Sequence, residues 1–133
     1  MIRHLTLTLL AVAFMTMAGT MGQGQTQESG SFLTSMPEIP LMPGLVEEED
    51  AFVVFDKPAG RFVETVFQGN TAPSAVREYY MNTLPPLGWK LMNATENARG
   101  GTLTFTREGE RLVLVIGPAG SGATVRLRLE PIT

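Results

Sequence analysis

Three charged side chains flank one predicted turn and are the first candidates for chemistry. Asp56 and Lys57 precede the residues P-A-G, and Arg61 follows directly after them. Cations beside a turn can bind an anionic ligand or a partner's carboxylate through charge-assisted hydrogen bonds. The simpler interpretation is turn chemistry, in which the aspartate accepts main-chain hydrogen bonds and the cations stay in water. We keep Asp56, Lys57 and Arg61 as candidate binding residues.

Carboxylates are the second group that could do chemistry. A pair of them can serve as acid and base in glycoside hydrolysis. The acidic residues considered for this role form no pair at a recognisable spacing; they are Asp50, Asp56, Glu64 and Glu78. A carboxylate-dependent hydrolase is therefore a remote alternative.

Two residue types that carry much of enzyme chemistry are almost missing from the sequence. The chain has no cysteine, and its one histidine, His4, lies within the predicted signal peptide, so the mature chain is expected to have none. This excludes a thiol nucleophile, a Ser-His-Asp triad and a histidine-based metal site. The glycine clusters at 99–101 and 117–122 match no phosphate-binding motif and are typical of turns. We therefore expect no catalytic residue, no metal and no cofactor, and hence no enzyme.

The charge balance argues against nucleic acid as a partner. The 10 basic residues are outnumbered by 13 acidic ones, which gives a net charge of −3. Proteins that bind nucleic acid need a basic surface to neutralise phosphates. We therefore expect no nucleic acid partner.

The first 22 residues have the pattern of a secretory signal peptide. A basic start precedes an apolar block over residues 5–18, which is shorter than the roughly 17–25 residues of a membrane-spanning helix. We predict a signal over residues 1–22, cleaved after Ala18 or Gly22, with an uncleaved anchor as the alternative. The protein is then periplasmic or secreted, with no membrane span after cleavage. It also lacks the lipobox cysteine of a lipoprotein.

Two segments without regular periodicity separate the signal from the domain. Residues 23–36 are polar and glycine-rich, which favours a flexible tether. Residues 37–50 begin with prolines at positions 37, 40 and 43, a spacing that favours an extended strip, and they end in an acidic run. The apolar residues of this strip either cover part of the domain core or bind a partner. The candidate binding residues of the strip are Leu41, Met42 and Leu45.

Residues 51–133 are predicted to form one α+β domain. The patterns favour β-strands at 51–56, 61–69, 89–94, 102–107, 111–117 and 123–130. Apolar residues at helical spacing favour one helix between Thr71 and Leu84, ended by a pair of prolines. The simplest architecture is an antiparallel β-sheet with a single α-helix packed on one face, in ββαββββ order, after an extended N-terminal segment.

Three strings carry a resemblance to a known group of proteins. They are P-L-M-P-G-L at 40–45, F-D-K-P-A-G-R at 55–61 and Y-Y-M-N-T-L-P-P-L-G-W at 79–89. Together they resemble a group of small exported bacterial proteins of unknown function. The last string and the strands after it also resemble a widely used envelope module with one helix on an antiparallel sheet. The resemblance implies an exported α+β domain and no particular activity.

These observations favour a non-enzymatic exported interaction module with an envelope protein as its partner. The proline-rich strip or an exposed sheet edge would supply the contact. The alternative is a carrier that holds a lipid or another small apolar ligand between helix and sheet. Tyr79, Tyr80 and Trp89 would lie near such a ligand, although aromatic residues at helical spacing more often belong to the core.

Overall fold

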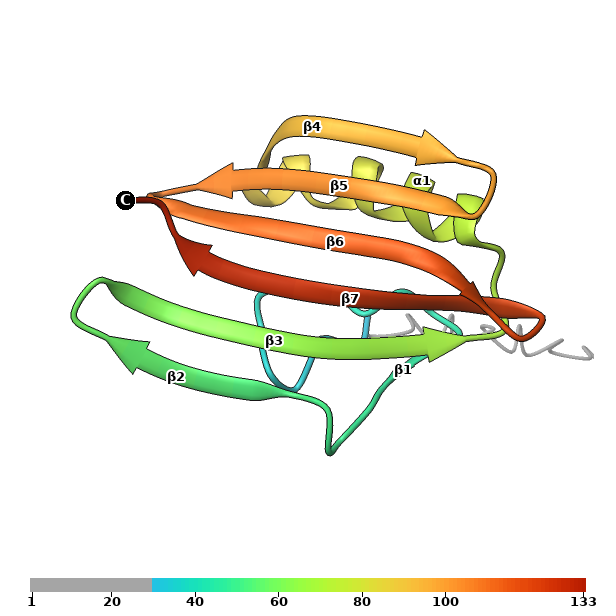
Figure 1. The fold of residues 1–133 in the computed structure, drawn as a ribbon, viewed down its shortest axis with the longest axis horizontal. Coiled ribbons are helices and arrows are strands. Elements are labelled where there is room, and N and C mark those ends of the chain that lie inside the picture. Colours follow the sequence, from blue (N-terminus) through green and yellow to red (C-terminus); the bar gives the residue numbers. More distant parts are fainter. Residues whose placement is uncertain (1–29) are drawn as a thin grey trace, which may run out of the picture.

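The computed structural model describes residues 30–133, which form a seven-stranded antiparallel sheet and one α-helix (Figure 1). The sheet order is β1-β3-β7-β6-β5-β4, and β2 pairs with β3 on the same side as β1. The helical elements are α1 (Pro73–Thr83) and a short 3-10 helix, η1 (Pro85–Leu87). The strands are β1 (Leu45–Glu47), β2 (Val53–Lys57), β3 (Gly60–Gly69), β4 (Lys90–Asn97), β5 (Gly100–Arg107), β6 (Glu110–Ala119) and β7 (Gly122–Pro131).

The predicted fold class is confirmed. Every strand expected within residues 51–133 is present, in the expected order around the single helix. β1 is an additional strand, formed inside the segment that was predicted only as an extended strip. It pairs with the end of β3 because Leu45, at 5% exposure, packs into the core there.

The helix forms where its apolar spacing predicts it. Val76, Tyr80 and Leu84 recur at helical spacing and are fully buried. Pro73 occupies the first turn, where the main-chain N–H it lacks would have no partner. The chain then reverses at Gly88, whose φ of 92° favours glycine, and enters β4. Within residues 30–133 no helix is long and apolar enough to cross a membrane.

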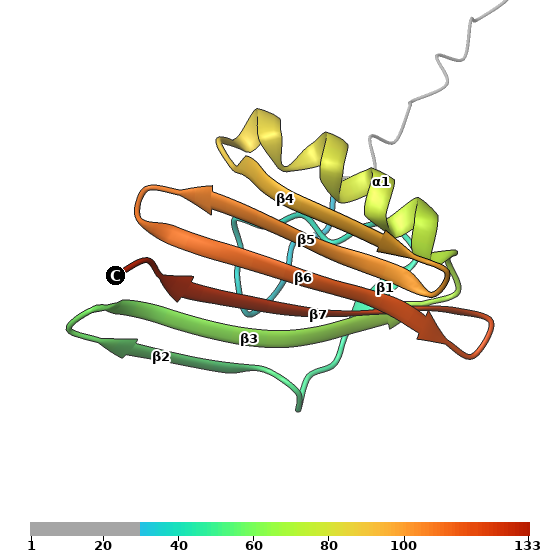
Figure 2. The same ribbon diagram turned by 45° about the horizontal axis from the view of Figure 1, so that its top comes forward.

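Two elements cover the inner face of the sheet. The helix α1 packs on β5, β6 and β7. Residues 30–44, which we call the strap, pack against the same core beside the helix and lie on the same side of the sheet in both ribbon views (Figure 2). The strap buries Leu33, Met36 and Ile39 at 0–1% exposure. It is thus an integral part of the core, although it is not regular secondary structure.

This burial corrects part of the predicted tether. Residues 23–29, like the predicted signal over 1–22, lie outside the described residues. Residues 30–36 were also assigned to the flexible tether, yet Leu33 and Met36 are buried. The correction follows from physical chemistry, because burying large apolar side chains stabilises the domain enough to order the chain around them.

The outer face of the sheet is not covered by any described element. Arg126, Arg128 and Val115 point outward and are exposed, while their neighbours Val125 and Leu127 are buried. This alternation is typical of an antiparallel sheet with one solvated face.

Candidate functional site

An apolar groove lies between the strap and the edge of the sheet. Its volume is about 500 Å³, and its lining consists of Phe32, Thr34, Leu41, Val46, Glu47, Glu49 and Phe52. We call it the strap groove. Phe32 and Val46 form exposed parts of its wall, at 54% and 69% exposure. A mostly apolar lining with a few polar groups is typical of sites for small molecules.

Glu47 ties the strap to the sheet beside the groove. Its carboxylate accepts hydrogen bonds from the main-chain N–H groups of Thr34 at 2.5 Å and Ser35 at 3.3 Å. The hydroxyl groups of Thr65, at 2.7 Å, and Ser35 donate to it as well. Burial alone raises the pKa of Glu47, but these hydrogen bonds outweigh it and leave the pKa below its ordinary value. Glu47 is therefore ionised at neutral pH and gives the groove an anchored negative charge.

Tyr80 ties the strap to the helix. Its hydroxyl donates a hydrogen bond to the main-chain oxygen of Pro40 at 2.9 Å and accepts one from the N–H of Met42 at 3.2 Å. Burial raises the pKa of Tyr80, and the bond from Met42 offsets only part of that effect. The hydroxyl therefore keeps its proton and can donate and accept at once.

A charged cluster anchors the turn of the strap. Glu38 forms an ion pair with Arg61, which also pairs with Glu110 at 2.8 Å. The hydrogen bond to Glu110, and secondly the contact with Glu38, raise the pKa of Arg61 although burial opposes them. Arg107 lies 4.0 Å from Glu38 and stacks over Trp89, 4.3 Å from the ring centroid. The cluster thus connects the strap to β3, β5 and β6.

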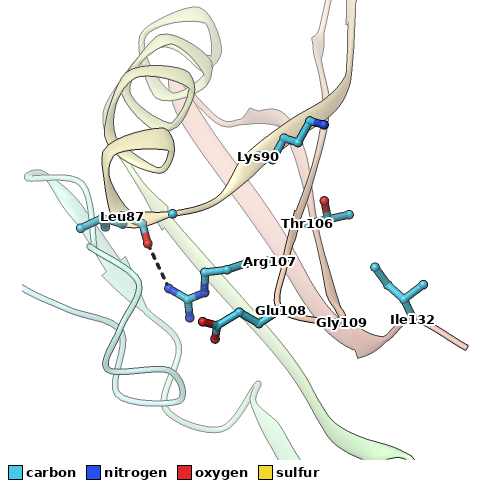
Figure 3. A pocket seen from close by; sticks show the side chains of 8 residues that line it. Leu87, Lys90, Thr106, Arg107, Glu108, Gly109 and Ile132 are labelled. Carbon is cyan, nitrogen blue, oxygen red and sulfur yellow. Dashed lines mark hydrogen bonds between the residues drawn. The ribbon is translucent and has the colours of Figure 1, made fainter.

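A second hollow lies at the β5–β6 turn (Figure 3). Its volume is about 550 Å³, and its lining consists of Leu87, Gly88, Lys90, Thr106, Arg107, Glu108, Gly109 and Ile132. The guanidinium of Arg107 donates to the main-chain oxygen of Leu87 at 3.2 Å. Lys90 and Arg107 point away from each other in Figure 3. Because the two cations do not converge, this hollow is a weaker candidate than the strap groove.

The profile of a START domain-like family matches residues 56–124, which is more than half of the chain. The chain belongs to this START domain-like family. The match runs from β2 to β7 and contains α1. The strap, β1 and the strap groove lie outside it.

The crystal structure of CalU16 from Micromonospora echinospora is 16% identical, and the match covers 67% of this chain and 71% of that chain with a TM-score of 0.34. No curated protein matches the chain.

The structure places the candidate residues of the strip against the domain. Leu45 is buried, and Leu41 and Met42 are partly buried and pack on the core. Leu41 also lines the strap groove. The strip therefore covers core, and binding of a partner by Leu41 and Met42 stays a prediction.

The candidate residues of the hairpin do not converge on one site. Arg61 is held in the charged cluster of the strap. The Nζ atom of Lys57 lies over the rings of Phe55 and Phe62, 5.2 and 5.3 Å from their centroids. Asp56 lies opposite Arg61 in the β2–β3 pairing and is exposed. The two cations thus take part in different contacts of the fold.

Protein side chains fill the space between helix and sheet. Tyr80 and Trp89 are 0% and 1% exposed, and Phe67 and Phe105 are fully buried as well. Tyr79 is only partly buried and stacks edge-on against Tyr80, with centroids 5.0 Å apart. The aromatic side chains expected near a ligand at this position are therefore mostly part of the core, and a carrier site between helix and sheet stays a prediction.

The carboxylates considered for hydrolysis are dispersed. Glu64 pairs with Arg128 at 2.8 Å on the exposed face of the sheet, while Glu78 is exposed on α1. Asp50 and Asp56 are exposed in the loop before β2 and in β2 itself. Among the described residues, no group of three or more histidine, cysteine, aspartate or glutamate side chains is placed to hold a metal ion.

Leu41 is the one residue of the groove lining that was a candidate from the sequence; the other six are Phe32, Thr34, Val46, Glu47, Glu49 and Phe52. Phe32 lies in the predicted tether, and Glu47 belongs to an acidic run of the kind that is usually solvated. One signal was available for Glu47. Thr65 alternates in the sequence with the apolar residues Val63 and Phe67, which indicates one apolar strand face, and a buried hydroxyl needs a hydrogen-bond partner.

Proposed function

We propose that this protein is a non-enzymatic, exported binding module that holds a small apolar ligand in the strap groove. The observation that carries the proposal is the lining of Phe32, Leu41, Val46 and Phe52 around a space of about 500 Å³. Ligand sites typically measure about 300–1,000 Å³ and bury the apolar part of the ligand. The two carboxylates of the lining favour a ligand whose polar end is neutral or cationic.

Membership of the START domain-like family supports a binding role, because this fold suggests a ligand-binding protein. The matched residues 56–124 do not include the strap. The position of the ligand therefore rests on the groove of this chain alone.

Export is the second part of the proposal. It rests on the signal-like residues 1–22 and on the resemblance to small exported bacterial proteins. The intact mass of protein recovered from the envelope fraction tests it. Loss of the residues up to Ala18 or Gly22 is the expected result, and an uncleaved chain in the cytoplasm contradicts export.

Native mass spectrometry of protein purified gently from its own host tests the groove. The wild type is expected to carry the mass of a small molecule. Val46→Glu should lose it, because the variant adds a further carboxylate at an exposed position of the lining. Val115→Glu is the matched control, since Val115 is also an exposed strand valine but lies on the outer face. A wild type without ligand, or a ligand that survives Val46→Glu, contradicts the proposal.

A docking site for an envelope protein is the second candidate function. A hollow of about 310 Å³ beside the groove is lined by Gly30, Ser31, Leu41, Met42, Pro43, Gly44 and Leu45. An apolar side chain of a partner would contact Leu41 and Met42 there. Affinity capture from envelope extracts tests this with the double variant Leu41→Ala/Met42→Ala, and Met92→Ala/Val115→Ala is the exposed control pair. Partners that persist in the strip variant contradict this candidate.

A further inference from the structure

The strand β2 forms an edge of the sheet that no other described strand covers (Figure 1). It pairs with β3 alone, and all five of its residues are exposed. Val53, Val54 and Phe55 are large apolar residues with 53%, 49% and 43% exposure. An exposed edge strand with apolar side chains is a template for pairing with another strand.

The register shows which main-chain groups this edge leaves open. The N–H of Glu48 donates to the oxygen of Val66 at 2.9 Å, so the even-numbered residues of β3 direct their main-chain groups toward this edge. These residues lie opposite the odd-numbered residues of β2. The odd-numbered residues of β2 therefore pair with β3, while Val54 and Asp56 direct their N–H and C=O groups out of the sheet.

An aromatic stack already crosses β2 and β3 on the outer face. The rings of Phe55 and Phe62 have centroids 5.1 Å apart and planes inclined by 11°. The ammonium group of Lys57 lies over both rings. Phe62 covers Phe55 from the side of β3, so the other side of Phe55 faces the open edge.

We propose that β2 pairs antiparallel with β2 of a second copy of this chain, about a twofold axis at Phe55. In this register Val54 of each copy lies opposite Asp56 of the other, so the open main-chain groups of both strands form hydrogen bonds. The two Phe55 rings lie opposite each other and extend the stack to four rings. The same residues act on both sides, as a twofold contact requires.

Neighbouring registers fit this strand less well. An axis at Asp56 places two carboxylates directly opposite each other, and like charges at such positions destabilise a strand pair. An axis at Val54 places Phe55 opposite Val53 and separates the two aromatic stacks. Only the axis at Phe55 joins the rings without opposing like charges.

The contact predicts a weak dimer. The strand has five residues. A pairing of this length buries less than the roughly 1,200–2,000 Å² of a stable interface. The dimer should therefore form as concentration rises. The inference does not depend on the ligand of the strap groove, because no residue of β2 lines that groove.

Sedimentation equilibrium of the purified protein over a wide range of concentrations tests the contact. The average molecular mass of the wild type should rise from that of the monomer toward that of the dimer as the concentration increases. Phe55→Lys should remain monomeric, because it opposes two ammonium groups across the axis. Val54→Thr should still dimerise, since it keeps the N–H and the β-branched shape. A wild type that stays monomeric, or a Phe55→Lys variant that dimerises equally well, overturns the proposal.

Val54→Pro keeps the test valid if Phe55→Lys does not fold. It removes an N–H that the monomer does not use, and proline is tolerated where that group faces out of an edge strand. This variant should melt as a folded protein and should be monomeric. Dimers that persist in folded Val54→Pro overturn the strand pairing.

The register can be tested directly because the chain has no cysteine. Residues opposite each other in a pair without mutual hydrogen bonds have Cα atoms about 4.5 Å apart, within reach of a disulfide. Mild oxidation should therefore link Phe55→Cys into a covalent dimer. Val46→Cys, on the neighbouring strand β1, is the control and should stay monomeric. Equal linkage of both variants, or of neither, overturns the proposed register.

Discussion

The helix α1 and the strap cover the same face of the sheet in different ways. The helix satisfies its main chain by its own hydrogen bonds and contributes buried side chains at helical spacing. The strap has few internal main-chain bonds; one runs from Leu33 N–H to the oxygen of Ile39 at 3.0 Å. It depends on Glu47 and Tyr80 for others.

This difference decides which part of the inner side of the domain is hollowed. The side chains of the helix fill their half of the inner face, and that half has become a core of fully buried aromatic and aliphatic residues. The strap is irregular and leaves hollows along its border with β1 and the loop after it. The strap, which is harder to recognise from the sequence than the helix, therefore forms one wall of the candidate site.

The largest expected loss of stability comes from truncating a residue in the part of the core that the helix α1 covers. Trp89 lies between η1 and β4 and is 1% exposed. Truncation of a buried aromatic residue costs about 3–5 kcal/mol. We therefore expect Trp89→Ala to lower the free energy of unfolding in urea by that amount. A variant with near wild-type stability would show that this half is not the tightly packed one.

A comparable loss of stability on truncation of a strap residue would show that the strap and the helix α1 pack into one core. Met36 is fully buried, so Met36→Ala is expected to lower the free energy of unfolding by about 2–5 kcal/mol. Ser31→Ala, at an exposed position of the strap, is the control and should change it by less than about 0.5 kcal/mol. If both variants behave alike, the strap is a loose attachment, as the tether prediction had it.

Removal of the polar anchor should have a smaller effect. Glu47→Ala leaves the buried hydroxyl of Thr65 and two N–H groups of the strap without their acceptor. An unsatisfied buried group such as the Thr65 hydroxyl costs about 1–3 kcal/mol. Glu49→Ala removes an exposed carboxylate of the same groove and should be close to neutral. Urea unfolding measures both, and equal losses would mean that Glu47 does not anchor the strap.

The smallest effect is a dependence on pH. The pKa of Glu47 is lowered on folding, so its contribution to stability is present above its ordinary pKa and is lost as pH falls through the lower pKa of the folded protein. The stability gap between wild type and Glu47→Gln should therefore narrow below about pH 4. Unfolding curves at a series of pH values measure the gap. A constant gap down to pH values well below that would contradict the lowered pKa.

The helix half could be predicted from the sequence, and the strap only in part. Helical spacing identified the buried face of Val76, Tyr80 and Leu84, and alternation identified the strands. The strap has neither helical nor strand periodicity. Its apolar residues Leu33 and Met36 stand in a mostly polar segment, which predicted a flexible tether. The role of Glu47 depends on Thr65, which is 18 residues away in the chain, and no local pattern reports such a contact.

We propose that an apolar ligand binds beside the strap and not beneath the helix. Methyl NMR spectra, recorded while the neutral apolar dye N-phenylnaphthylamine is added, test it most directly. We expect the methyl signals of Leu41 and Val46 to shift, because both side chains line the strap groove. Those of Val76 and Leu84 should stay in place, because both are fully buried under the helix. Shifts confined to Val76 and Leu84 would contradict the account.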